Sequence, residues 1–326
     1  MIPDSPTPDA YGFHQYGAYN CSGEQMPFFQ DTQRAAAFIR QSASANQPFF
    51  VQVWIHEPHT PFHTLPKYEW QFKHLPERED QIYASVIAHA DDRIGQLLLT
   101  LDSLKLAKNT LVIFSSDNGP ARAASSTELL LQYDTATGAG WGIAASKGET
   151  GGRRGYKSSL FEGGIGVPFL IRWPGVVAPG RVDDQSLISA VDLMPTLLEV
   201  AGVVQSKELA LDGISMLQAW KGRPMPHRTK PLFWHFDAPW PAPRNRPDHW
   251  GSWAMVHGSH KLVANRDFTH LELFDMRSDM SESTPLHDAK AEQSRVMLSA
   301  LREWKAQLPS QPTGRVFSSM RDQKKP

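Results

Sequence analysis

Four side chains, distant from one another in the sequence, are of types that could act together on an anionic ester. Asp117 and Asn118 lie near the end of the stretch Leu111-Val-Ile-Phe-Ser-Ser-Asp-Asn-Gly-Pro120 and offer a carboxylate and an amide oxygen. Such hard oxygen ligands favour Ca²⁺, and less strongly Mg²⁺, over zinc. Because two ligands do not complete a coordination shell, further oxygens must come from elsewhere. Asn-Gly is also a strong hairpin-turn signal, so a simple turn is the competing interpretation.

Two basic side chains could contact the ester itself. His59 stands in Pro58-His-Thr-Pro61, where it could donate a hydrogen bond or act as a general acid. Its structural alternative is a histidine that only holds its loop. Lys157 lies in the glycine-rich stretch 155–164, where a compact cation could meet an anionic group. The alternative for Lys157 is a solvated surface lysine.

The histidines around His59 could also be interpreted as a zinc site, but the sequence supports this interpretation less well. His56, His59 and His63 are good zinc ligands by residue type. Pro58 and Pro61 interrupt the regular helix on which such spacing usually works. We therefore favour a role for His59 alone.

The elements around these residues predict that they meet at one edge of a sheet. Residues 49–55 and 109–115 are apolar and β-branched runs typical of buried strands, and residues 79–101 form an amphipathic helix between them. Strand, helix and strand in this order indicate a parallel crossover unit, whose ligand crevice lies beyond the carboxyl ends of the strands. Because His59 and Asp117 follow those ends, and a parallel strand does not leave through a tight hairpin, the site interpretation gains over the turn.

The rest of the pattern predicts an α/β protein with a smaller second part. We expect residues 1–205 to belong to the α/β domain and residues 206–326 to form a small α+β subdomain. The remaining expected elements are helices at 31–45, 187–200 and 289–307 and strands at 167–173, 232–236, 253–256, 261–263 and 271–274, the last four antiparallel.

Composition excludes several function classes. The 326 residues contain 33 Lys+Arg and 34 Asp+Glu, so no global positive field exists to collect nucleic acid or anionic lipid. The single cysteine, Cys21, excludes an intrachain disulfide. Met1 is not followed by a secretory signal, and no apolar run is long enough to span a membrane. Compartment and oligomeric state stay open.

Taken together, these motifs resemble the sulfatases of the alkaline phosphatase superfamily. The resemblance covers about residues 28–290 and includes Pro48-Phe-Phe-Val-Gln-Val-Trp-Ile-His-Glu-Pro-His-Thr-Pro61, the stretch 111–120, Lys157-Ser-Ser-Leu-Phe-Glu-Gly-Gly164 and Val167-Pro-Phe-Leu-Ile-Arg-Trp-Pro-Gly175. It implies an alkaline-phosphatase-like, mainly parallel sheet flanked by helices, and hydrolysis of sulfated carbohydrates or aryl sulfates. By that resemblance Asp117 and Asn118 would bind calcium, His59 would contact the sulfate or protonate the leaving oxygen, and Lys157 would hold the sulfate.

The sequence departs from the family pattern at the nucleophile. Sulfatases resembling this chain carry a Cys-x-Pro/Ala-x-Arg motif, or its serine version, whose first residue becomes formylglycine. Cys21 does not fit, because Gly23 and Gln25 stand at the decisive positions. A second departure is Gly166, where many relatives carry arginine. The chain thus looks like the C-terminal two-thirds of a sulfatase. The alternatives are a non-catalytic sulfatase-like binding protein or fragment, and a zinc-dependent phosphoester hydrolase of the same superfamily.

Overall fold

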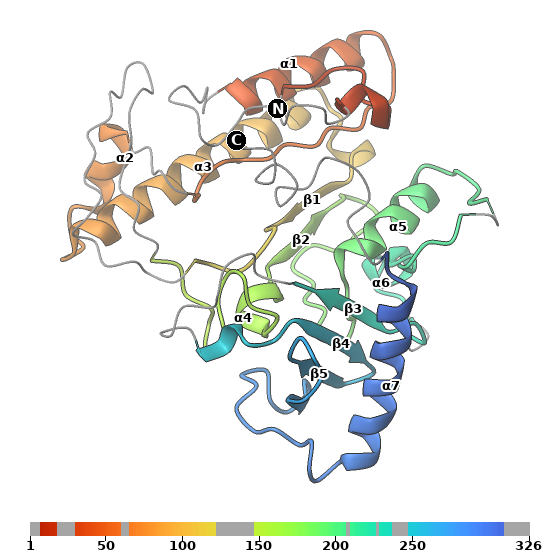
Figure 1. Ribbon diagram of the computed structural model, residues 1–326. Coiled ribbons are helices and arrows are strands. Elements are labelled where there is room, and N and C mark those ends of the chain that lie inside the picture. The colour runs from red at the N-terminus through yellow and green to blue at the C-terminus, as the bar shows by residue number, and fades with distance from the viewer. Residues whose placement is uncertain are drawn as a thin grey trace, which may run out of the picture. The chain divides into compact units, whose positions relative to one another are not determined.

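The computed structural model describes residues 7–17, 30–59, 65–121, 147–206, 209–225, 228–236 and 247–309 (Figure 1). The chain separates into two compact units. The first comprises Met1–Ala107, Ala121–Gly148 and Pro309–Pro326, and the second comprises Lys108–Pro120 and Glu149–Leu308. The domain boundary at 205/206 stays a prediction.

Two helices form the centre of the first unit. Helix α1 (Gln30–Ser44) packs against helix α3 (Arg78–Ser103), and both confirm the helices predicted from the sequence. Their buried faces include Ile39 on α1 and Ile82 and Val86 on α3. These residues recur every three or four positions, which is the spacing of one helix face. The shorter elements of this part of the chain are η1 (Pro8–Tyr11), α2 (Pro66–Glu69), η2 (Trp70–Phe72) and η3 (Ala107–Asn109).

The predicted strand at 49–55 is wrong. The segment is not assigned to any strand, and the side chains of Phe50 and Trp54 are 60% and 82% exposed. A strand needs a neighbour to complete its hydrogen-bond ladder, and within the described residues no strand pairs with this segment. The parallel crossover unit is therefore also wrong.

The second unit opens with a two-stranded antiparallel ribbon. Strand β1 (Val112–Ser115) pairs with β2 (Phe169–Arg172), and Val112 lies opposite Arg172. These strands confirm the central parts of the runs at 109–115 and 167–173. Ile113 and Ile171 pack against the cluster that contains Trp220 of helix α6 (Leu217–Trp220). Nearby, η5 (Ala190–Asp192) leads into α5 (Leu193–Val200), so the helix predicted at 187–200 begins later than expected.

An antiparallel sheet with a helix on it forms the C-terminal part of the second unit. Its strand order is β3-β4-β5-β6, with β3 at Leu232–His235, β4 at Trp253–His257, β5 at His260–Ala264 and β6 at Leu271–Asp275. Helix α7 (Ala291–Gln307) follows, and η6 (Pro247–His249) precedes β4. All five predictions for this region are confirmed.

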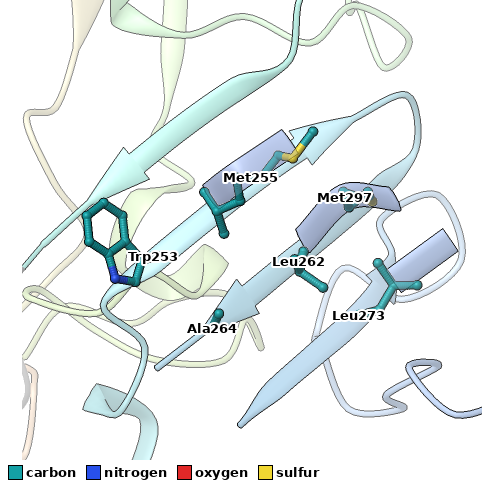
Figure 2. Close-up of a cluster of buried hydrophobic side chains, with 7 residues drawn as sticks. Trp253, Met255, Leu262, Ala264, Leu273 and Met297 are labelled. Carbon is teal, nitrogen blue, oxygen red and sulfur yellow. The ribbon is translucent and has the colours of Figure 1, made fainter. Parts of the chain in front are cut away.

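Both faces of this sheet are covered. On one face, strand residues pack with Met297 and Leu301 of α7; Figure 2 shows Trp253, Met255, Leu262, Ala264 and Leu273 of this cluster. On the other face, Ala254, Val263 and Phe274 pack with Leu160 and Phe161, directly before helix α4 (Glu162–Ile165). Trp253 and Met255 lie on one face and Ala254 on the other, because successive side chains of a strand point to opposite faces of the sheet. The segment that contains Lys157 is therefore anchored on the sheet by two apolar side chains.

Candidate functional site

The turn after β1 carries two of the predicted site residues. Asp117 is exposed and Asn118 is half-buried. Ser116 Oγ donates a hydrogen bond to the Asn118 backbone oxygen at 2.9 Å, and Asn118 Nδ2 donates to the Gly119 oxygen at 3.0 Å. Because an amide nitrogen only donates hydrogen bonds, Oδ1 is the atom with which Asn118 could bind a cation.

Among the described residues, this turn does not close a hairpin. The strand that pairs with β1 there is β2, where Phe114 lies opposite Leu170, so the simple hairpin interpretation is wrong for that part of the chain. Gly119 instead allows the backbone of the turn to approach the backbone of Gly163 and Gly164 closely. Its N–H donates to the Gly164 oxygen at 2.8 Å, and a Cβ atom at position 119 would lie 1.9 Å from the Gly163 oxygen. Only glycine fits such a backbone approach.

Lys157 lies on the segment that meets this turn. Its N–H donates to the Pro120 oxygen at 2.9 Å. The next residue, Ser158, has φ +72°, a left-handed conformation that costs a residue with a Cβ about 1–2 kcal/mol. Ser159 N–H donates to the Tyr156 oxygen at 3.0 Å and closes the turn. Such strain persists only where the surroundings fix the backbone, and it concentrates at ligand sites.

Three of the four predicted residues therefore lie on two segments that are hydrogen-bonded to each other. Both segments, 116–120 and 155–164, belong to the second unit, whereas His59 belongs to the first. A half-open hollow of about 560 Å³ also lies in the second unit, between α5 and residues 209–215. None of the predicted site residues lines this hollow, so it is not part of the candidate site.

His59 lies in a turn, where its N–H donates to the His56 oxygen at 2.7 Å, and the neighbouring Glu57 is tied to α3 by a buried ion pair. The exposed His59 ring lies 5.4 Å from the His56 ring, centroid to centroid. Glu57 is buried, and its two carboxylate oxygens accept from Arg93 Nη1 at 2.8 and 2.9 Å. His89 Nδ1 lies 3.2 Å from the same carboxylate. Burial lowers the pKa of Arg93 to about 10, so the guanidinium stays charged at neutral pH.

The donor set fits a hard cation only in part. Among the residues that the structure describes, no group of three or more His, Cys, Asp or Glu side chains is arranged to hold a metal ion. Asp117 and Asn118 offer two oxygens at an accessible turn, which suits calcium or magnesium and not zinc. His63 of the possible zinc group, and Cys21, lie outside the described residues.

Two groups of charged side chains that hold the segment of Lys157 were missed by sequence reasoning. Arg154 pairs with Asp248 and Glu272, which stand 94 and 118 positions further along the chain. Lys261, which is fully buried, pairs with Glu162 and Glu282 at 2.8 Å each. Burial raises the pKa of the Glu282 carboxyl, against the lowering effect of Lys261. Partners so distant in sequence leave no spacing signal.

Comparison with known proteins identifies the family. The sulfatase family matches residues 4–203, and the family described as "N-sulphoglucosamine sulphohydrolase, C-terminal" matches residues 152–307. The chain belongs to the sulfatase family, as the sequence motifs predicted. Within the described part of the chain, no helix is both long and apolar enough to cross a membrane.

Curated relatives are longer than this chain. An uncharacterized sulfatase of Escherichia coli is 30% identical over 237 residues, which cover 68% of this chain and 38% of the relative. A human N-acetylgalactosamine-6-sulfatase is 31% identical over 208 residues, covering 62% and 34%. A Formosa agariphila sulfatase is 26% identical over 272 residues, covering 76% and 44%. The chain thus spans less than half the length of these relatives.

Solved structures share the fold. The crystal structure of Ps i-CgsB in complex with k-i-k-neocarrahexaose has a TM-score of 0.72 at 21% identity, covering 96% of this chain and 64% of that one. A second Ps i-CgsB structure has a TM-score of 0.67 at 23% identity, with 84% and 54% covered. The predicted fold class, alkaline-phosphatase-like α/β with a small antiparallel sheet and helix at the C-terminus, is confirmed.

Proposed function

We propose that this chain carries the sulfate-binding and leaving-group half of a calcium-dependent sulfate ester hydrolase. Asp117 and Asn118 hold the cation, Lys157 holds the sulfate, and His59 contacts the sulfate or protonates the leaving oxygen. One observation carries the proposal. The turn of Asp117 and Asn118 and the segment of Lys157 are joined by backbone hydrogen bonds at 2.8 and 2.9 Å.

Charge is the physical basis of this assignment. The Lys157 ammonium has three N–H donors and no acceptor, so it suits the oxygens of a sulfate group. When bound, calcium would supply further positive charge that polarises the sulfate oxygens. Asp117 and Asn118 are the residues that would hold it. The family membership of the chain supports the pairing of a hard cation with a sulfate ester.

His59 has the chemistry of a proton donor to the leaving oxygen. A protonated imidazole can give its proton to the leaving oxygen as the bond between that oxygen and sulfur breaks, so that an alcohol departs. The Glu57–Arg93 pair holds the segment in which His59 lies. We assign no attacking group, because no stretch of the printed sequence matches the Cys/Ser-x-Pro/Ala-x-Arg pattern and Cys21 does not fit it.

Sulfated carbohydrates are the substrate class that we favour. The relatives include N-acetylgalactosamine-6-sulfatases, and the C-terminal match is to an N-sulphoglucosamine sulphohydrolase family. A rat steryl-sulfatase is also similar, at 31% identity over 209 residues, so aryl and steroid sulfates should be tested as substrates as well. Specificity in such proteins lies in loops around the shared site.

Calcium binding provides the first test. We expect Ca²⁺ to raise the thermal midpoint of the full chain, since a ligand that binds only the folded state stabilises it. The Asp117→Asn variant should lose this rise because the carboxylate ligand is gone. The control Asp184→Asn removes another exposed carboxylate of the second unit and should keep it. Equal calcium responses in the two variants would place the cation elsewhere.

Sulfate ester chemistry provides the second test. We expect N-acetylgalactosamine 6-sulfate to bind in calorimetry only while Lys157 is present, and turnover to stay near the uncatalysed rate. Binding that survives Lys157→Ala contradicts the proposal. Turnover that depends on Lys157 would mean that an attacking group lies within these residues. Zinc-dependent hydrolysis of a phosphoester would favour the phosphoesterase alternative.

A further inference from the structure

Arg154 lies three residues before Lys157 and has several partners on distant segments. Its Nε donates to Asp248 at 2.8 Å, and its Nη1 donates to Glu272 at 2.6 Å and to the Glu282 backbone oxygen at 3.3 Å. The guanidinium carbon lies 3.9 Å from the centre of the Phe161 ring. A planar fork that meets two carboxylates and an aromatic face at once is a geometry that lysine does not reproduce.

The backbone of the same residue closes the segment that contains Lys157. Gly163 N–H donates to the Arg154 oxygen at 2.6 Å, so residues 154 and 163 form the base of a closed loop. Ser159 Oγ donates to the Asp248 backbone oxygen at 2.7 Å. A Cβ atom at Gly163 would lie 2.1 Å from the Gly155 oxygen, which shows how closely the two ends of the loop approach.

A second ion cluster holds the far end of this loop. The Lys261 ammonium lies 2.8 Å from carboxylate oxygens of both Glu162 and Glu282. The Glu162 N–H also donates to Glu282 at 2.6 Å. The loop is therefore bound to the antiparallel sheet at its start by Arg154 and at its end by Lys261. Lys157 lies between these two attachments.

We infer that Arg154 is a positioning residue for Lys157: by bridging Asp248 and Glu272 it holds the loop in the conformation that brings the Lys157 backbone against the turn of Asp117. The inference rests on the proposed sulfate-binding role of Lys157. In this role Arg154 acts through its contacts with Asp248 and Glu272 and not on the sulfate itself. Its removal would leave two neighbouring carboxylates without their shared cation, and their repulsion would open the start of the loop.

Hydrogen exchange tests the positioning directly. In Arg154→Gln we expect the amides of residues 155–161 to exchange at least about tenfold faster, because the Lys157 hydrogen bond to Pro120 opens more often. The amides of β5 should keep their protection. The control is Arg181→Gln, since Arg181 is similarly exposed, pairs with Asp183 at 2.9 Å and donates to the Ala219 oxygen at 2.9 Å elsewhere in the unit. Unchanged exchange at 155–161 in Arg154→Gln would overturn the inference.

Sulfate protection of Lys157 tests the consequence for binding. Trace acetylation of Lys157 in the full chain, followed by mass spectrometry, should be slowed by inorganic sulfate. In Arg154→Gln the same slowing should need about tenfold more sulfate, because a small misplacement weakens a positioned contact strongly. Arg181→Gln should behave as wild type.

The outcomes separate this inference from the function on which it rests. If sulfate does not slow acetylation in the wild type, the proposed role of Lys157 fails and the inference fails with it. If the wild type is protected and Arg154→Gln is protected equally, the inference alone fails. Arg154→Lys keeps the charge without the fork and should be intermediate in both measurements. If Arg154→Gln also loses protection in β5, the variant is generally destabilised and Arg154→Lys is used in its place. Exchange at 155–161 and sulfate protection that are both unchanged from wild type in Arg154→Lys would then overturn the inference.

Discussion

Buried ion pairs support two of the segments that carry predicted site residues, those of His59 and Lys157. Arg93 holds Glu57 in the first unit, and Lys261 holds Glu162 and Glu282 in the second. Transfer of these charges out of water is expensive, and their mutual attraction repays it only when the geometry is complete. Such pairs are therefore weak evidence for net stability. They do fix the position of a backbone segment, because breaking one leaves a buried charge short of a partner.

Removal of the Glu57 charge should be strongly destabilising. We expect Glu57→Gln to lower the opening free energy of α3 amides by about 2 kcal/mol, because Arg93 loses its most deeply buried partner and, among the described residues, keeps only the pair with Asp31 and the contact with the Thr32 hydroxyl. Hydrogen exchange measures this locally. The control Glu69→Gln breaks the more exposed Arg78–Glu69 pair, at 2.7 Å, and should cost no more than about 1 kcal/mol. Similar losses of opening free energy in Glu57→Gln and Glu69→Gln would contradict the expected difference between a buried and an exposed ion pair.

Among the elements, α7 and the start of β5 are linked by a titratable contact. Lys290, the residue before the first turn of α7, has its Nζ 2.8 Å from His260 Nε2. Burial lowers the pKa of His260 below 6.5, the Lys290 charge lowers it further, and Asp275 opposes the shift. The unfolded chain therefore binds the proton more tightly than the folded chain. The stability contribution of His260 is complete above pH 6.5 and is lost as the pH falls below it.

Exchange protection of α7 should follow this titration. Between about pH 7.5 and about pH 5.5 we expect wild-type protection, corrected for the intrinsic exchange rate, to decline as His260 takes up a proton beside Lys290. His260→Gln should flatten the decline. His257, opposite His260 in the β4–β5 pairing, provides the matched control, and His257→Gln should retain the wild-type slope. A flat wild-type profile would count against the contact.

For the whole molecule, the two compact units have separate apolar cores. Ile82 and Val86 form a cluster in the first unit. Met297 and Leu301 belong to the cluster between the sheet and α7 in the second. Units with their own cores can open independently, because the loss of packing in one does not remove contacts from the other.

A cavity in the second core should therefore leave the first unit unaffected. We expect Leu301→Ala to lower the opening free energy of α7 and β5 amides by about 2–5 kcal/mol while α3 keeps its protection. Glu57→Gln should have the opposite effect: α3 amides should lose protection while α7 and β5 amides keep theirs. Val296, an exposed residue of the same helix, supplies the control, and Val296→Ala should change little. Loss of α3 protection in Leu301→Ala would indicate a single cooperative structure.

Local pattern was sufficient for most elements of this protein. The three- and four-residue spacing over 79–101 and 289–307 predicted α3 and α7, because a helix buries one face whatever it packs against. The strands at 253–256 and 261–263 were likewise recognised from short β-branched and aromatic runs. The prediction failed at 49–55, where an equally apolar run has no strand partner among the described residues.

The residue types in the motifs predicted the chemistry, namely two oxygen ligands, an imidazole and an ammonium group, and they also predicted the family. Tertiary structure decided which of these residues are neighbours: it joined the turn of Asp117 to the loop of Lys157 and supplied Arg154 with partners 94 and 118 positions away. The reason is physical. Helix periodicity and turn preference are set by neighbours along the chain, whereas strand pairing and buried ion pairs depend on segments that meet only when the chain has folded.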